Sequence, residues 1–253
     1  MSEQSKIPEL VNGFVSTLNQ MGYMTAKPDP ISKEFIDYSI QDNLSGSILD
    51  VGAAYGVATI PVLKHKLSTQ RVIALDIDHR HLELLKSSAI NQGLEVDSLE
   101  LITSKFPDGS ELDLHVGSVA SMLICRVLHF FNGELVERSF KKAYSLLQSG
   151  AKLFVVNETP YLNNFKEFIP IFEKRKAKGV KYPGYIEDVQ AVAPERGKNL
   201  PKTIHFFDPD SMSDFAKNAG FVVEKAEFIN RTDFPSDLRL DGRESVGIVC
   251  RKP

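Results

Sequence analysis

An acidic residue followed by small residues at alternate positions stands out in the stretch Asp50-Val51-Gly52-Ala53-Ala54-Tyr55-Gly56. Ile48, Leu49 and Val51 are apolar β-formers, so the acid lies near the end of a predicted buried strand. Glycines at such a strand end let a ligand approach the backbone because they lack Cβ, and the helix that follows presents unpaired N–H groups. The stretch predicts a site for a phosphate, a carboxylate or a nucleoside.

A second acid, Asp76, ends the next predicted strand, Arg71–Asp76. It follows Gly56 by about 20 residues, as expected when two consecutive strands run parallel. A carboxylate in this place can accept hydrogen bonds from both hydroxyls of a ribose. Asp78 competes for this role, since period-two geometry points its side chain the same way if the strand continues.

The elements that must position these acids alternate between strands and helices along most of the chain, which predicts an α/β protein. Predicted helix boundaries include Asp29-Pro30 and Asp208-Pro209 at starts, Gly220 as a cap, and Ser149-Gly150 at a stop. Pro61 fits a helix only within its first turn. The predicted strands are 48–51, 71–76, 99–102, 119–127, 152–156, 221–226 and 245–250, with helical patterns after the first, second and fourth and another between 208 and 220.

The glycine spacing separates two kinds of nucleotide site. The dinucleotide fingerprint has glycines at relative positions one, three and six, where this chain has Gly52, Ala54 and Val57. The spacing Asp50-x-Gly52-x-Ala54-x-Gly56 instead resembles motif I of class I S-adenosylmethionine-dependent methyltransferases, with alanine in place of the usual middle glycine. Two closing strands without a helical segment between them also resemble the end of that family's sheet.

The resemblance implies a doubly wound, mostly parallel seven-stranded sheet with an antiparallel last strand and a cap over its carboxyl edge. It covers residues 46–160 well and 206–253 more loosely. We expect an N-terminal helical cap over residues 1–45, a cofactor-binding core over 46–160, an insert forming an acceptor lid over 161–205, and completion of the core sheet by 206–253. The expected cofactor is S-adenosylmethionine and the expected acceptor a small molecule.

The resemblance also assigns roles to the cofactor-site residues. Asp50 and the backbone of Gly52, Ala53, Ala54 and Gly56 would face the methionine moiety. The remaining predicted contacts are Asp76 on the ribose hydroxyls, Ile77 as an apolar wall to adenine, Phe106 stacked on the base, Ser104 bonded to it, and Arg126 paired with the cofactor carboxylate or a substrate anion. Core packing is the alternative for Phe106.

Three residues are candidates for the catalytic chemistry. Methyl transfer from a sulfonium is an in-line displacement, so alignment and exclusion of water supply much of the acceleration. A hydroxyl acceptor also benefits from a base, and His129, after the fourth strand, is the best-placed imidazole. Glu158 and Tyr161 follow the fifth strand, where acceptor pockets form in this family. A structural role for His129 is the alternative, and O-methylation is the reaction that a base would favour.

The insert combines basic and apolar side chains. Lys166, Lys174, Arg175, Lys176, Lys178 and Lys181 alternate with aromatic and aliphatic residues, which indicates either a solvated helix or a lid for an anionic or elongated acceptor. His205, Phe206 and Phe207 at the end of the insert are further candidates for the pocket wall.

Composition limits the partners. The 253 residues are 42% hydrophobic and 25% charged, with a net charge of −3, which gives no electrostatic reason to bind nucleic acid or an anionic membrane. No apolar run is long enough to span a bilayer and the polar start is no signal peptide, so we expect a cytoplasmic protein. Cys125 and Cys250 are expected to be buried reduced thiols, too few for a metal cluster. The sequence does not indicate an oligomeric state.

Two other functions remain open at this point. An NAD(P)-dependent oxidoreductase would use the same strand–turn–helix unit, although the glycine spacing and the closing strand pair argue against it. A non-catalytic cofactor-binding regulatory protein of the same fold would carry the same cofactor residues without turnover.

Overall fold

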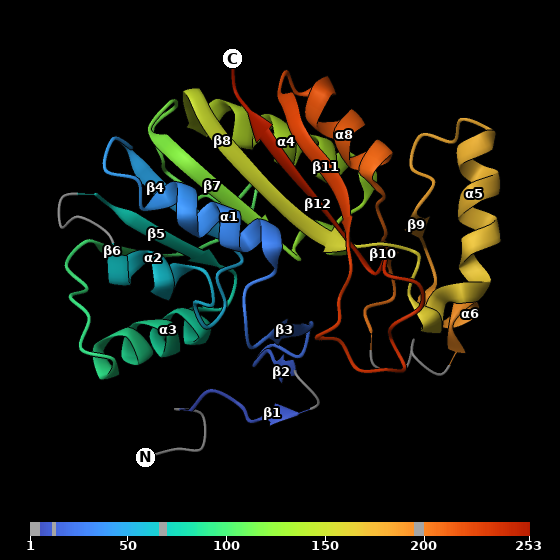
Figure 1. Ribbon diagram of the computed structural model, residues 1–253, viewed down its shortest axis with the longest axis horizontal. Coiled ribbons are helices and arrows are strands. Elements are labelled where there is room, and N and C mark those ends of the chain that lie inside the picture. The colour runs from blue at the N-terminus through green and yellow to red at the C-terminus, as the bar shows by residue number, and fades with distance from the viewer. Residues whose placement is uncertain (1–5, 12–13, 66–69, 195–199) are drawn as a thin grey trace.

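A seven-stranded sheet in the order β11-β12-β8-β7-β4-β5-β6 forms the centre of the computed structural model, which describes residues 6–11, 14–65, 70–194 and 200–253 (Figure 1). All neighbouring strands pair in parallel except β12, which is antiparallel to both of its neighbours. The predicted mostly parallel sheet with an antiparallel last strand is confirmed. The strands are β4 (Ser47–Val51), β5 (Val72–Asp76), β6 (Leu99–Thr103), β7 (Val119–Cys125), β8 (Leu147–Glu158), β11 (Val222–Ile229) and β12 (Ser245–Arg251).

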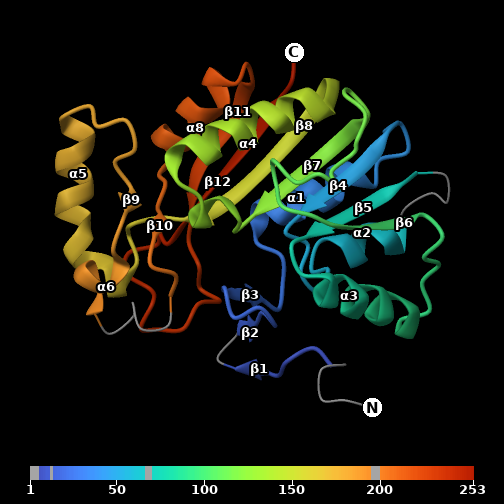
Figure 2. The same cartoon turned by 180° about the vertical axis from the view of Figure 1, so that it is seen from behind.

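Helices cover both faces of this sheet (Figure 2). Successive residues of a strand point to opposite faces, so Ile48 packs in the apolar cluster beneath the first helices and Leu49 in the cluster on the other face. One face carries α1 (Pro30–Ser39), α2 (Thr59–His65) and α3 (His79–Asn91), and the other carries α4 (Gly133–Leu146) and α8 (Pro209–Asn218).

The predicted helix starts are confirmed at residue level. Asp29 caps α1 by accepting hydrogen bonds from the N–H groups of Ile31 and Ser32, and Pro30 is the first helical residue. Asp208 caps α8 in the same way ahead of Pro209. Pro61 is the third residue of α2, inside the first turn, where its missing N–H leaves no hydrogen bond unmade.

Two predicted boundaries around β7 and β8 are wrong. The predicted helix stop at Ser149-Gly150 does not exist, because Leu147 already adopts an extended backbone (φ −69°, ψ 144°) and begins β8. The N–H of Gly150 donates to the carbonyl of Lys252 (2.8 Å), so a contact with the end of the chain replaces the expected turn. The fourth predicted strand ends at Cys125 rather than at 127, because Arg126 has φ +59° and leaves the strand.

Among the described residues before Ser47, only α1 is helical, and residues 10–11, 14–16 and 23–25 are extended where a helical cap was expected. These residues form the antiparallel strands β1 (Leu10–Val11), β2 (Phe14–Ser16) and β3 (Tyr23–Thr25). Val15 is buried against Tyr55 and its neighbour Ser16 is exposed, an alternation that suits a strand lying on the core. Figure 1 shows β2 and β3 close to the edge of the sheet where the central parallel strands end.

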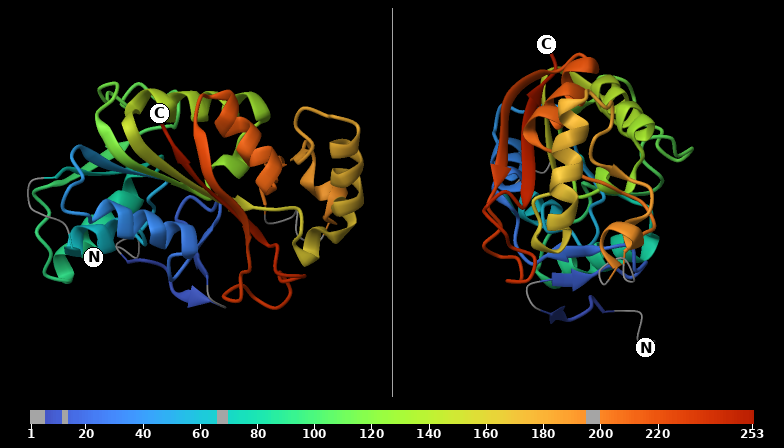
Figure 3. Two further views of the ribbon diagram at one scale, coloured as in Figure 1. Left: turned by 45° about the horizontal axis from the view of Figure 1, so that its top comes forward. Right: turned by 90° about the vertical axis from the view of Figure 1, so that its right-hand side faces the viewer.

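The insert has regular structure of its own beyond the β11 edge of the sheet (Figure 3). Its apolar side chains, with Phe234 and Leu238 from the loop after β11, form a separate cluster that contains Phe165, Phe172 and Phe206. No helix in the described ranges combines the length and the apolar character needed to cross a bilayer. The elements of the insert are η3 (Asn163–Phe168), α5 (Ile169–Ala177), β9 (Tyr185–Ile186), α6 (Val189–Val192) and β10 (Ile204–His205).

Candidate functional site

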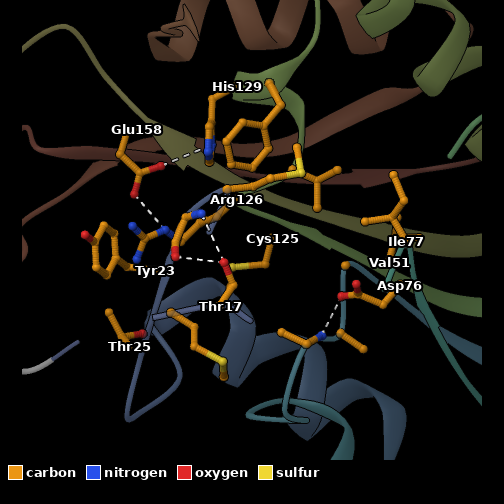
Figure 4. Close-up of a pocket in the computed structure, with 18 of the residues that line it drawn as sticks. Thr17, Tyr23, Thr25, Val51, Asp76, Ile77, Cys125, Arg126, His129 and Glu158 are labelled. Carbon is orange, nitrogen blue, oxygen red and sulfur yellow. Dashed lines mark hydrogen bonds and ion pairs between the residues drawn. The ribbon is translucent and has the colours of Figure 1, made fainter. Parts of the chain in front are cut away.

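A cavity of about 560 Å³ lies at the carboxyl ends of β4, β5 and β7 (Figure 4). The strand order reverses here, since β5 lies on one side of β4 and β7 on the other, and open α/β sheets bind ligands at such a switch point. The predicted site residues that line it are Asp50, Gly52, Ala53, Ala54, Asp76, Ile77, Ser104, Phe106, Arg126, His129 and Glu158.

The turn after β4 has an unusual backbone at two lining positions. Gly52 has φ +74°, and a Cβ there would collide with a methyl group of Val127. Ala54 has φ +44°, a left-handed conformation that costs an L-residue about 1 kcal/mol or more. Ala54 therefore adopts a backbone conformation that a glycine would adopt without strain.

Gly56 has a different role from the one predicted. It does not line the cavity, and its φ is +83°. A Cβ at this position would stand 2.7 Å from Cγ of Leu85 and 3.1 Å from Cγ1 of Ile60. Gly56 therefore allows α3 to pack closely against the turn.

Asp76 holds the turn and the next helix together. Its Oδ2 accepts a hydrogen bond from the N–H of Ala54 (3.0 Å), and its Oδ1 accepts one from the N–H of Asp78 (2.9 Å) and lies 3.0 Å from Nδ1 of His81. The competitor Asp78 caps α3 and pairs with Arg80 at 2.5 Å, and it does not line the cavity. The structure thus places Asp76, rather than Asp78, at the cavity wall.

Three lining residues form the wall beside Asp76. Ile77 is 49% exposed although it is apolar, so its side chain is free to contact a ligand. Phe106 is buried and lines the cavity, and it also belongs to the main core cluster. Its position is therefore compatible with both predicted roles, stacking on the base and packing in the core. Ser104 is buried, and its Oγ lies 3.4 Å from a carboxylate oxygen of Glu111.

Asp50 is buried at the base of the cavity. The hydroxyl of Thr59 donates to its Oδ2 at 2.6 Å. Burial raises the pKa of Asp50 from 3.8 to about 6, the Thr59 hydrogen bond opposes this rise, and the nearby charge of Asp76 adds to it.

Replacing Asp50 with asparagine is expected to raise the free energy of unfolding relative to wild type, and to do so more at pH 7 than at pH 4. Between pH 3.8 and about 6 the native carboxyl binds more protons than the unfolded one, so stability falls as pH rises and the full penalty holds above pH 6. A shift of this size corresponds to about 3 kcal/mol. Urea unfolding at both pH values measures the difference between Asp50→Asn and wild type. Asp97→Asn, in an exposed turn, is the control, and an equal Asp50→Asn effect at pH 4 and pH 7 would contradict the prediction.

Arg126 follows β7 with a left-handed backbone (φ +59°). Its Nε lies 2.8 Å from Oε1 of Glu158 at the end of β8. Its guanidinium carbon lies 5.7 Å from the ring centre of Phe14 and 5.4 Å from that of Phe234, within the range of a cation–π contact. The predicted partner of Arg126 was a cofactor or substrate anion, whereas here its charge is already paired with a carboxylate of the protein.

His129 and Glu158 form a buried pair at the cavity wall. Nδ1 of His129 lies 3.4 Å from Oε2 of Glu158, and the two residues are only 9% and 8% exposed (Figure 4). Burial lowers the pKa of His129 to about 4, against the attraction of Glu158. Burial raises the pKa of Glu158, but Arg126, His129 and Arg231 outweigh it and the net pKa is lowered. Near neutral pH the pair is therefore a neutral imidazole beside a carboxylate.

His129 is held at the start of a short helix, with its ring beside Glu158. The backbone N–H of His129 donates to Oδ1 of Asn157 (3.3 Å), which fixes the start of the short helix η2 (Leu128–Phe130). Among the described residues, Nδ1 of His129 and both carboxylate oxygens of Glu158 are buried without a hydrogen bond of good geometry, so the two side chains form a close electrostatic pair. A carboxylate beside Nδ1 favours the tautomer in which Nε2 is a proton acceptor.

Tyr161 lies away from the cavity, contrary to the prediction. Its hydroxyl bonds to Glu173 of α5, its ring packs beneath Arg243, and it does not line the cavity. None of the six basic residues singled out above in the insert lines the cavity, and one of them, Lys176, bonds to Asp208 and Asp210. Of the three residues at the end of the insert, only Phe206 lines the cavity.

The residues that roof the cavity were not predicted from the sequence. Asp29, whose capping role was predicted, also lies in the wall. No short-range signal connects these roof residues to the strand ends, although the aromatic and β-branched residues of 14–25 favour strands. The missed lining residues include Phe14, Thr17, Tyr23, Met24, Thr25, His81, Phe234 and Leu238.

Comparisons with known proteins agree with this architecture. Residues 48–150 match the family model described as a methyltransferase domain. A search of curated proteins gave no significant match. Among solved structures, an S-adenosylmethionine-dependent methyltransferase from Mesorhizobium loti is 15% identical, with a TM-score of 0.60 over 88% of this chain and 98% of that one.

Two further solved structures show the same similarity. A SAM-dependent methyltransferase from Aquifex aeolicus is 13% identical, with a TM-score of 0.53 over 88% of this chain and 89% of that one. Geranyl diphosphate methyltransferase in complex with GPP and sinefungin is 10% identical, with a TM-score of 0.60 over 88% and 76% of the two chains. At these identities the likeness establishes the fold.

Proposed function

Because this chain carries a class I S-adenosylmethionine-dependent methyltransferase domain and uses S-adenosylmethionine as its cofactor, we propose that it methylates a hydroxyl group of a small, largely apolar acceptor. The observation that supports the hydroxyl is the buried pair of His129 and Glu158 at the cavity wall. The methyltransferase match of residues 48–150 favours this reaction over hydride transfer with NAD(P).

The cofactor half of the cavity fits the family's cofactor. Gly52 lines the cavity with backbone alone, and Asp76 lines it as a buried carboxylate. We assign Asp76 to the ribose hydroxyls, Ile77 and Phe106 to the adenine, and Asp50 with the turn at Ala54 to the methionine moiety. When bound, S-adenosylmethionine supplies a methyl group on a positively charged sulfur, from which a nucleophile displaces it in line.

The rest of the cavity supports a small apolar acceptor. Its walls come from the N-terminal strands, the insert and the loop after β11, so we propose that these parts form the acceptor cap. Arg126 and Glu158 neutralise each other's charge at the wall of this part of the cavity. Apolar lining with few convergent polar groups is typical of small-molecule sites. The apolar side chains here include Phe14, Met24, Leu162, Phe165, Ile204, Phe206, Phe234 and Leu238.

In the proposed mechanism His129 is the base. Its imidazole would accept the proton of the acceptor hydroxyl as that oxygen receives the methyl group. Glu158 orients the imidazole and stabilises the charge that His129 acquires. The buried walls exclude water and hold the acceptor in line, which contributes much of the acceleration.

Labelling with the methyl donor tests this proposal. The full-length protein is incubated with [methyl-³H]S-adenosylmethionine and cell extract, which is then separated into a small-molecule filtrate and a macromolecular retentate. We expect the label in the organic-soluble part of the filtrate, on an oxygen identified by mass spectrometry of the product. Label found only on protein or nucleic acid would refute the small-molecule acceptor, and label on nitrogen, carbon or sulfur would refute O-methylation.

A further inference from the structure

His81 is a buried imidazole that makes a contact with each of its ring nitrogens. Nε2 accepts a hydrogen bond from the backbone N–H of Leu18 at 3.0 Å, and Nδ1 lies 3.0 Å from Oδ1 of Asp76. The residue is 1% exposed. Because Nε2 is an acceptor, a neutral His81 carries its proton on Nδ1 and donates it to Asp76. One side chain therefore joins the carboxylate that we assign to the ribose with the backbone of the N-terminal region.

Tyr55 makes a second contact between the same two parts. Its hydroxyl donates to the carbonyl of Ser16 at 3.0 Å, and its ring lies edge-on to His81 with centres 5.2 Å apart. Tyr55 also packs with Val15 and Leu84 in a small apolar cluster. Tyr55 belongs to the turn after β4, so this contact too starts from the cofactor half of the cavity.

The segment held in this way covers the acceptor half of the cavity. We call residues 14–25 the roof segment. Phe14, Tyr23 and Met24 line the cavity from this segment, and Phe14 also contacts the guanidinium of Arg126. The position of the roof segment therefore affects both the space for the acceptor and the surroundings of Arg126.

We propose that His81 is a positioning residue that couples occupation of Asp76 by the cofactor to ordering of the roof segment. This inference rests on the proposed function, since it takes the ribose as the ligand of Asp76. Ribose hydroxyls bonded to Asp76 restrain its carboxylate, the carboxylate restrains the imidazole, and the imidazole holds the N–H of Leu18. Outer hydrogen bonds of this kind are known to orient the groups that contact a ligand.

Amide hydrogen exchange of the roof segment, with and without saturating S-adenosylhomocysteine, tests the coupling. The test variant is His81→Asn, whose side-chain amide still donates to Asp76 but no longer reaches Leu18. The matched control is His79→Asn, an exposed histidine on the same helix. In wild type and His79→Asn we expect S-adenosylhomocysteine to slow exchange over residues 14–25. In His81→Asn the slowing should shrink about two- to tenfold, the effect of one hydrogen bond.

The outcomes separate the coupling from the proposed function. Equal ligand-induced slowing in His81→Asn and wild type would overturn the coupling while leaving cofactor binding intact. Failure of the wild type to bind S-adenosylhomocysteine in calorimetry would overturn the proposed function, and the coupling with it. If His81→Asn does not fold by circular dichroism, Leu18→Pro replaces it, because proline lacks the N–H that donates to Nε2 of His81, and Leu18 is the second residue of a turn closed by the N–H of Gln20 and the carbonyl of Thr17. Undiminished slowing in Leu18→Pro would then overturn the coupling.

Discussion

Asp76→Ala is expected to lower the affinity for S-adenosylhomocysteine by at least about 100-fold. Asp76 is buried at the cavity wall, and we assign both ribose hydroxyls to its carboxylate. Hydrogen bonds to a charged group contribute about 1.5–3 kcal/mol each, so losing two corresponds to roughly 10²–10⁴ in affinity. The variant also removes the acceptor for the N–H of Ala54, which loosens the turn that faces the methionine moiety. Isothermal titration calorimetry gives the dissociation constants.

Asp78→Ala is the matched control for this measurement. Asp78 follows two residues later, caps α3 and lies outside the cavity lining. Its loss should cost about 1 kcal/mol of stability through the missing cap, with little change in ligand affinity. An Asp76→Ala variant that is folded by circular dichroism and binds as tightly as Asp78→Ala would exclude Asp76 as the ribose partner. Asp76→Asn, which keeps one acceptor oxygen, should give an intermediate affinity.

His129→Gln is expected to lower kcat by roughly 10²–10⁴, the usual contribution of a positioned general base. Cofactor affinity should change little, since we place His129 beside the acceptor rather than the ribose. The comparison requires the acceptor found by labelling, and single-turnover rates separate the chemical step from product release. If kcat is unchanged, His129 is structural and does not act as the base.

The pH profile of the same enzyme provides a second test of His129. Burial lowers the pKa of His129 to about 4, so the imidazole is neutral at pH 7 and becomes protonated only as pH falls toward 4. Wild-type kcat should therefore fall below about pH 5 rather than near the ordinary histidine pKa of about 6.5, and His129→Gln should lack this decline. His205→Gln is the control. His205 is also buried with its pKa lowered to about 4, but it bonds to the carbonyl of Phe131 and lies outside the cavity.

The sheet could be predicted because each part of its pattern is local. Apolar runs and caps such as Asp29 and Asp208 mark strands and helix starts within a few residues of themselves, and the family resemblance supplies the strand order. The errors arise where distant contacts override local signals. Gly150 was predicted to end a helix, but it lies in β8 and its N–H donates to the carbonyl of Lys252. Arg126 ends β7 because its backbone is left-handed, which the sequence does not indicate.

The cavity wall around Asp50 and Asp76 was predictable for the same reason. Asp50, the turn and Asp76 follow consecutive strands, whose carboxyl ends must meet at one edge of a parallel sheet. The roof could not be predicted, because Phe14 and Phe234 approach Arg126 from opposite ends of the chain. Tyr161 was misplaced because its position just after β8 does not determine its side-chain partner, which is Glu173 of α5.

The cavity is built from chain segments that leave the ribosome at different times. Asp50, the turn and Asp76 emerge from the ribosome early, and β6, which flanks β5, ends at Thr103. The roof segment emerges earlier still, but Phe234, the aromatic partner of Phe14, is translated more than 200 residues later. The wall around Asp50 and Asp76 can therefore be assembled on the nascent chain well before the roof, whose loop closes over more than 200 residues. A truncated chain that stops before Phe234 would keep Asp50 and Asp76 and leave the roof segment without its ring partner.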